Sequence, residues 1–151
     1  AKMDIINTSN PNEARKSADK LKREGKAFAI LSQDDEFNRK VLEIKGLKML
    51  IINENYPQKD YMKQRSSGLN EVLAEICANK SIAVGIQIEE IIKKDSKEQA
   101  RSLASLAQNI MLCKKAGCRL VFIGDIKNKR SLSSLMLSLG ASTKQAEQAS
   151  F

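Results

Sequence analysis

The sequence has no histidine and no tryptophan among its 151 residues, and only four Phe and two Tyr. Without histidine there is no imidazole base, no imidazole metal ligand, and no Ser–His or Cys–His pair for nucleophilic catalysis. Neither G-x-G-x-x-G nor the P-loop pattern occurs, so no nucleotide-binding signature is present. We therefore expect no catalytic residue in this chain and no cofactor.

Cysteine is also scarce. The three cysteines are Cys77, Cys113 and Cys118, and no two of them form a C-x-x-C pair. An odd number without paired spacing argues against a zinc site and against a disulfide framework, so we expect no metal and reduced, mostly buried thiols. No apolar run approaches the length of a membrane span, and no signal-peptide pattern opens the sequence. These features predict a soluble cytoplasmic protein that does not engage a membrane.

Positive charge is in excess. Twenty-six Lys and Arg against eighteen Asp and Glu give a formal net charge of +8. A polyanion such as nucleic acid would explain this excess, because cations that neutralise phosphates release bound counterions. With so few aromatic side chains, base stacking would contribute little, and contacts to the shape and phosphates of a structured RNA fit better.

Apolar segments typical of strands alternate with amphipathic segments typical of helices along the whole chain. Strands are expected to start near residues 3, 27, 48, 82 and 119. This βα repeat predicts parallel strands joined by right-handed crossovers. Five strands are too few for a closed eight-stranded barrel. We therefore predict one domain over residues 1–151 with an α/β fold, a small or incomplete TIM-like βα barrel, and an open doubly wound sheet is the alternative.

Several helix boundaries are marked in the sequence. Asn10-Pro11 is typical of a helix start, and Ser142 to Gln145 is typical of a capping box. A helix expected over residues 69–79 carries Leu69, Val72, Leu73 and Ile76 at helical spacing, which predicts that these four side chains share its buried face.

Polar residues follow the expected strands, where βα folds gather ligands. Four carboxylates there offer oxygen ligands that Mg²⁺ accepts, although we favour their use as helix caps and solvated loop residues; they are Asp34, Glu54, Glu89 and Asp125. Two basic clusters each precede a helix start, whose free N–H groups and dipole favour a phosphate. We predict that these five cations bind RNA: Lys63, Arg65, Lys127, Lys129 and Arg130.

The order of segments resembles the archaeal and eukaryotic ribonuclease P protein component 3 family. The resemblance is strongest over residues 65–73, where a polar turn, Gly68-Leu69-Asn70 and an apolar helix follow one another. The strand over residues 83–88, the long helix over 101–115 and residues 117–123 are similar in type, as is the closing leucine-glycine turn before Ser142. Ile123-Gly124-Asp125 departs from the family's serine-rich turn.

The resemblance implies an incomplete or distorted βα barrel without catalysis of its own. It implies a protein subunit that binds ribonuclease P RNA and supports this RNA in 5′ maturation of precursor tRNA. The implied partners are that RNA, precursor tRNA through the complex, and other small ribonuclease P proteins. One alternative is a βα-barrel enzyme acting on a phosphorylated small molecule, with Lys127 or Arg130 on the phosphate. Another is a protein-interaction scaffold whose basic charge is incidental.

Overall fold

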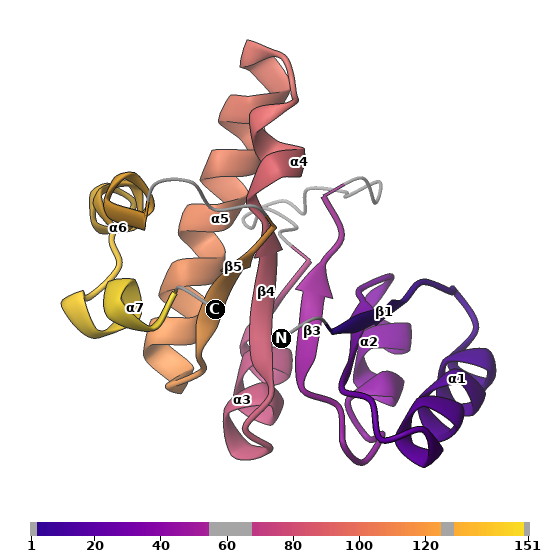
Figure 1. Cartoon of the computed structure of the whole chain (residues 1–151). Coiled ribbons are helices and arrows are strands. Elements are labelled where there is room, and N and C mark those ends of the chain that lie inside the picture. The colour runs from indigo at the N-terminus through magenta and orange to yellow at the C-terminus, as the bar shows by residue number, and fades with distance from the viewer. Residues whose placement is uncertain (1–2, 55–67, 125–128, 150–151) are drawn as a thin grey trace.

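In this computed structural model, strands and helices alternate along the chain, and the structure describes residues 3–54, 68–124 and 129–149 (Figure 1). The strands are β1 (Asp4–Ile6), β2 (Phe28–Leu31), β3 (Met49–Ile52), β4 (Ala83–Gln87) and β5 (Leu120–Ile123). The helices are α1 (Pro11–Arg23), α2 (Asp35–Val41), α3 (Glu71–Asn79), α4 (Ile88–Ile92), α5 (Ser96–Ala116), α6 (Lys129–Ser138) and α7 (Thr143–Gln148).

All five strands form one parallel sheet in the order β1-β2-β3-β4-β5. A doubly wound sheet would reverse its strand order near the middle, and this sheet does not, so that alternative is excluded. Within the described residues β1 and β5 do not pair with each other, and the sheet stays open. The predicted fold class, an incomplete TIM-like βα barrel, is therefore confirmed.

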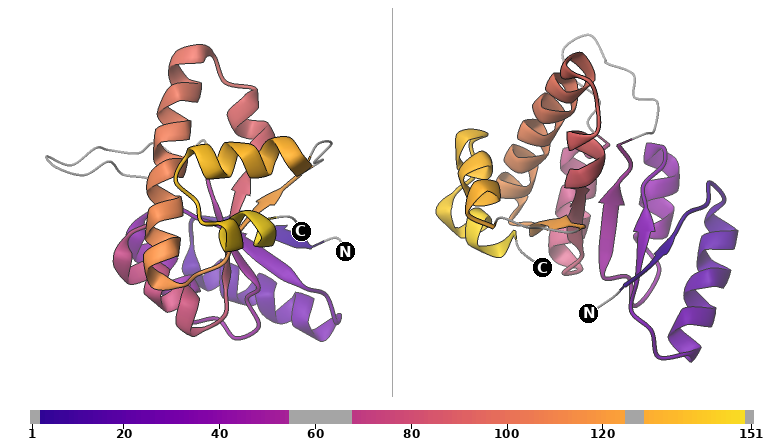
Figure 2. Two further views of the ribbon diagram at one scale, coloured as in Figure 1. Left: turned by 90° about the vertical axis from the view of Figure 1, so that its left-hand side faces the viewer. Right: turned by 45° about the horizontal axis from the view of Figure 1, so that its top comes forward.

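The main core lies between the sheet and the helices that cover it (Figure 2). Side chains on alternate strand positions point to this side, among them Phe28, Leu50 and Phe122, which are 0–1% exposed. Leu73 of α3 and Ile110 of α5 meet them from the helices. Burial of each such side chain contributes about 1.5–3 kcal/mol, so this layer supplies most of the driving force for folding.

The opposite face of the sheet has a second, smaller apolar cluster built from strand residues: Ala29, Met49, Ile51, Ala83 and Val121. Its side chains are tightly packed around β4. A Cβ atom added at Gly85 would lie 2.5 Å from Met49 Sδ and 3.2 Å from Ile51 Cγ1. Glycine at this position therefore leaves the space that the Met49 side chain occupies.

Several helices begin at side-chain caps that the sequence predicts. Asn10 accepts a hydrogen bond from the Asn12 amide, with Pro11 in the first position of α1. Ser142 and Gln145 form the reciprocal capping box of α7. Each cap satisfies amide groups that the first helical turn leaves without partners.

The expected buried face of α3 is partly wrong. Leu73, Ala74 and Cys77 are buried, whereas Val72 is 50% exposed. α3 contacts both β4 and α5, which centres its buried face on residues 73–77. Val72 is rotated by about 100° from Leu73 around the helix and so faces away from both neighbours.

The outer edge of β5 is partly covered by the chain that follows α7. The amide of Phe122 donates to the carbonyl of Ala149 at 2.8 Å, and Arg119 Nε donates to the carbonyl of Gln148 at 3.2 Å. Ala149 itself is buried against the core. This contact removes one free amide from the exposed edge of the sheet.

Candidate nucleic-acid interface

Charges are sorted along the direction of the strands. Cations fill the last turns of α1, α2 and α5, and carboxylates occupy the first turns of α1 to α5. This placement complements the helix dipole, which is negative at the carboxyl end of a helix. Because parallel βα units all run the same way, the last turns lie at the amino ends of the strands. That end of the sheet is therefore enriched in positive charge.

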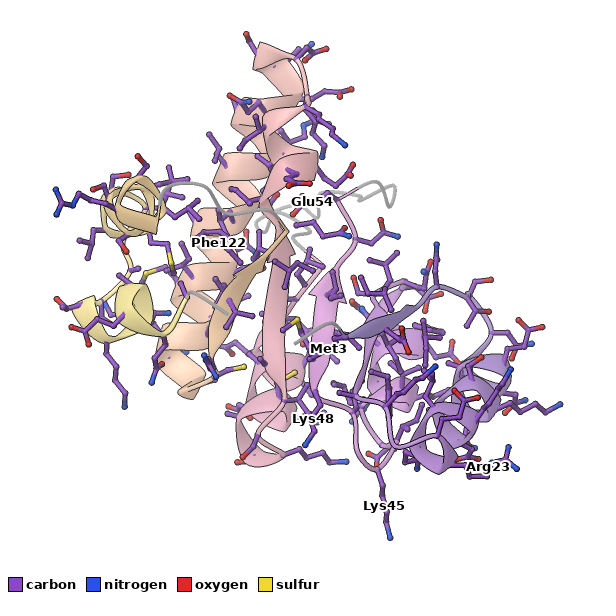
Figure 3. The ribbon with its side chains drawn as sticks, in the orientation of Figure 1. Met3, Arg23, Lys45, Lys48, Glu54 and Phe122 are labelled. Carbon is purple, nitrogen blue, oxygen red and sulfur yellow. The ribbon has the colours of Figure 1, made fainter. Side chains whose placement is uncertain are left out.

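Four exposed cations define a surface that we call the basic edge: Lys22, Arg23, Lys45 and Lys48. Lys22 and Arg23 belong to the last turn of α1, whereas Lys45 and Lys48 lie between α2 and β3. The two segments touch, since a Cβ added at Gly46 would lie 3.3 Å from Lys22 Cδ. Figure 3 shows Arg23, Lys45 and Lys48 at the end of the molecule opposite Glu54.

Three of these cations are available to a phosphate. Lys22 pairs with Asp19 at 3.4 Å, but within the described residues no ion pair involves Arg23, Lys45 or Lys48. Arg23 Nε donates to the carbonyl of Asp19 at 3.4 Å, which leaves its charge without a carboxylate partner among the described residues. Exposed cations without carboxylate partners can neutralise phosphates without first breaking an ion pair.

The sequence prediction missed the basic edge, although a signal for it was present. Cations recur in helical last turns and just before expected strands, positions that only the fold brings together. Of the five cations predicted to bind RNA, Lys63, Arg65 and Lys127 lie outside the described residues. Lys129 and Arg130 open α6, which begins two residues before the expected start at Ser131.

Lys129 and Arg130 therefore belong to a helix and not to a loop. They follow β5 and so lie toward the carboxyl ends of the strands, away from the basic edge. Arg130 is exposed to solvent. Lys129 and Arg130 thus lie at the opposite end of the sheet from the basic edge, and nothing in the described structure joins the two places into one surface.

Three of the four candidate Mg²⁺ carboxylates can be placed. Asp34 caps α2, accepting from the Phe37 amide at 2.7 Å, as the capping interpretation predicts. Glu89 is exposed, and its side chain lies close to Gly124. Asp125 lies outside the described residues. Among the residues that the structure describes, no group of three His, Cys, Asp or Glu is arranged to hold a metal ion.

Glu54 differs from a solvated loop residue, because its side chain is only 9% exposed. Its carboxylate lies 3.9 Å from Lys94 Nζ, which donates to the Glu54 carbonyl and to Ser102 Oγ, both at 2.8 Å. The pKa of Glu54 is raised to about 7, mainly because the carboxyl is buried. The nearby charge of Lys94 lowers this pKa, and the charge of Glu90 raises it. This network ties the end of β3 to the α4–α5 junction.

Gly68-Leu69-Asn70, the most specific part of the resemblance, has a structural role. Gly68 has a φ of +86°, in the left-handed region that glycine adopts without strain. Leu69 is buried in the core, and Asn70 Oδ1 accepts from the Leu73 amide at 2.9 Å as the cap of α3. The motif therefore makes a turn and starts a helix.

Among the helices that the structure describes, none combines the length and the apolar character that a membrane span requires.

The fold and its surface define a βα-repeat protein with an open parallel sheet and a basic edge at the amino ends of its strands. No family model matches the chain.

Sequence similarity to named proteins points to one family. A Methanothermobacter thermautotrophicus protein named ribonuclease P protein component 3 is 24% identical over 150 residues, covering 95% of this chain and 58% of that protein. The Methanosarcina acetivorans protein of the same name is 28% identical over 127 residues, covering 84% of this chain and 50% of its own length. The predicted resemblance to this family is confirmed. The chain spans between half and three fifths of the length of these two relatives.

Solved structures agree on the fold. A chain of archaeal ribonuclease P determined with mature tRNA superposes with a TM-score of 0.75 at 24% identity, over 95% of this chain and 62% of that chain. A prolidase superposes with a TM-score of 0.61 at 9% identity, over 94% of this chain and 36% of the enzyme. At sequence identities this low, both superpositions support the βα architecture and nothing beyond the fold.

Proposed function

We propose that this chain is an RNA-binding protein subunit of ribonuclease P that supports the catalytic RNA in 5′ maturation of precursor tRNA. The similarity to ribonuclease P protein component 3 over 95% of the chain carries the proposal. The net charge of +8 and the basic edge supply the contact that such a role requires. The proposed partners are ribonuclease P RNA, precursor tRNA through the complex, and other small protein subunits, in the cytoplasm.

The chain is proposed to act without an active site of its own, as one folded domain. Its contribution is then to stabilise the folded RNA by neutralising phosphates. Reconstituted precursor-tRNA cleavage with the cognate RNA and small subunits tests this role directly. Omitting this chain should lower activity, and adding it back should restore activity. Equal cleavage with and without the chain would refute the proposal.

The basic edge is the proposed RNA contact. Each phosphate that a cation neutralises contributes roughly −0.7 to −0.9 to the slope of log K against log salt. Replacing Arg23, Lys45 and Lys48 together by Ala should make that slope shallower by about 2–3, if all three contact phosphates. Folding should change little, because these side chains are exposed and form no ion pair within the described residues.

The cations predicted from the sequence remain a second proposed contact: Lys63, Arg65, Lys127, Lys129 and Arg130. Replacing Lys127, Lys129 and Arg130 together by Ala removes the same charge from this second cluster. If RNA engages the cluster, the slope becomes shallower by about 2–3 in this variant.

A matched control removes three exposed cations elsewhere, at Lys97, Arg101 and Lys144. It has the same net charge as the other two variants, so it separates a local contact from a general loss of attraction. An unchanged slope in the variant of the basic edge, with circular dichroism like that of the parent, would rule out that surface. Equal effects in all three variants would show that only net charge matters.

A further inference from the structure

The three cysteines lie far apart in the sequence and meet in the fold. Cys77 comes from α3, Cys113 from α5 and Cys118 from the turn before β5, and all three are free and buried. The thiol of Cys118 lies close enough to those of Cys77 and Cys113 for the three groups to shift one another's pKa. The Cys118 thiol donates to the carbonyl of Ile82 at 3.5 Å and to the carbonyl of Arg119 at 3.7 Å.

A pocket of about 580 Å³ opens beside this cluster, at the amino ends of the strands. Cys77 and Cys118 both line it, and Cys118 is 5% exposed whereas Cys77 and Cys113 are 0% exposed. The pocket is as large as those that bind small ligands. A molecule entering the pocket would therefore reach the Cys118 thiol first. The residue preceding each strand contributes to the wall: Met3, Ala27, Lys48, Ile82 and Arg119.

Two cations stand on the wall of the pocket. Among the described residues that line it, Lys48 and Arg119 are the charged ones, and both are exposed. Hydrogen bonds from Cys113 and Cys77 lower the pKa of Cys118, against the opposing effect of burial. The same contacts and burial raise the pKa of the other two thiols. Because Cys118 lines the pocket and is the most exposed thiol of the three, it is the member of the cluster that an entering molecule can react with.

We propose that this pocket is a thiol–disulfide exchange site in which Cys118 attacks a small anionic disulfide. Cys118 Sγ bonds to one sulfur of the disulfide RS–SR, and the S–S bond of that molecule breaks. The second sulfur leaves as RS⁻ and takes up the proton that the Cys118 thiol has lost. The products are a mixed disulfide on Cys118 and one RSH, with the electrons balanced between them.

Two observations favour a small anionic disulfide as the reactant. A thiol on the pocket wall can attack a disulfide bond, and the two cations of the wall attract an anion more than a neutral molecule. The site does not depend on RNA binding, and it can be tested on the isolated chain.

Oxidised glutathione, which carries several carboxylates, is the probe. We expect intact-mass analysis of the folded chain to find one glutathionyl adduct, and peptide mapping to place it on Cys118. Cys118→Ala should abolish the adduct. Lys48→Ala should slow the reaction about fivefold, as expected for the loss of one charge pair in water. Lys97→Ala, which removes an exposed cation far from the pocket, should react at the parent's rate.

A neutral disulfide tests the charge argument separately. Hydroxyethyl disulfide should react at the same rate with the parent and with Lys48→Ala, because it carries no charge. This comparison needs no substitution in the core, so it holds even if Cys118→Ala folds poorly. Simultaneous modification of all three cysteines, which signals reaction through unfolding, would overturn the proposal. So would an adduct on Cys77 or Cys113 alone.

Discussion

Replacing Glu54 by Gln should change how the stability of the protein depends on pH. Burial of the Glu54 carboxyl raises its pKa from 4.5 to about 7 in the folded state. The folded protein then holds this proton more tightly than the unfolded chain does, so ionised Glu54 disfavours folding. Stability should fall as pH rises from about 4.5 to about 7, and level off above that.

The size of the effect follows from the pKa difference of about 2.5 pH units. At about 1.36 kcal/mol per unit, full ionisation of Glu54 costs about 3 kcal/mol of folding free energy, as an upper bound. The carboxyl is only 9% exposed, so solvent screens little of this cost. Glu54→Gln keeps the size of the side chain and leaves Lys94 its bonds to the Glu54 carbonyl position and to Ser102.

Urea unfolding of the parent and of Glu54→Gln at several pH values between 4.5 and 8 measures the effect. The two should be nearly equal in stability at pH 4.5, and the variant should be more stable by up to about 3 kcal/mol at pH 8. Glu36→Gln, at an exposed carboxylate of α2, is the control and should show no such divergence. A stability difference between parent and Glu54→Gln that is the same at pH 5 and pH 8 would refute the reasoning.

Three further predictions concern packing and caps. Asn70→Ala removes the cap of α3 and should lower the free energy of unfolding by about 1 kcal/mol in urea titrations. Gly85→Ala places a Cβ 2.5 Å from Met49 Sδ and should cost about 1–3 kcal/mol, and Met49→Ala in the same chain should recover part of that loss in a double-mutant cycle. Gln145→Ala removes the α7 capping box and the bond from Nε2 to the Ile110 carbonyl, so amide hydrogen exchange in α7 should accelerate while β3 stays protected.

The alternation of strands and helices was predictable from the sequence because each element carries its own periodicity and its own cap. Asn10, Asp34 and Ser142 cap helices where local sequence indicates a helix start. The exposure of Val72 was not predictable, since it depends on how α3 packs against α5. Helical spacing identifies the apolar residues of a helix, but it does not show which of them the packing strands and helices cover.

The two proposed sites depend on contacts between distant segments. The meeting of Cys77 with Cys113 and Cys118 requires α3 to pack on α5, which no spacing in the sequence records. The basic edge likewise joins the end of α1 to the turn before β3. Clusters of cations along the chain are visible in the sequence, whereas a surface that joins distant segments at one end of a parallel sheet is visible only in the fold.

The distribution of charge along the strands also affects how the protein is oriented while it approaches a polyanion. The helices place cations in the last turns of α1, α2 and α5 and carboxylates in the first turns of α1 to α5, so these charges contribute a dipole moment along the sheet. In the field of a polyanion this moment produces a torque that turns the amino ends of the strands forward. The torque acts within about 10 Å of the surface at 0.1 M salt, the distance over which charge is screened. Orientation is then largely set during approach, and rising salt should slow productive association by randomising it.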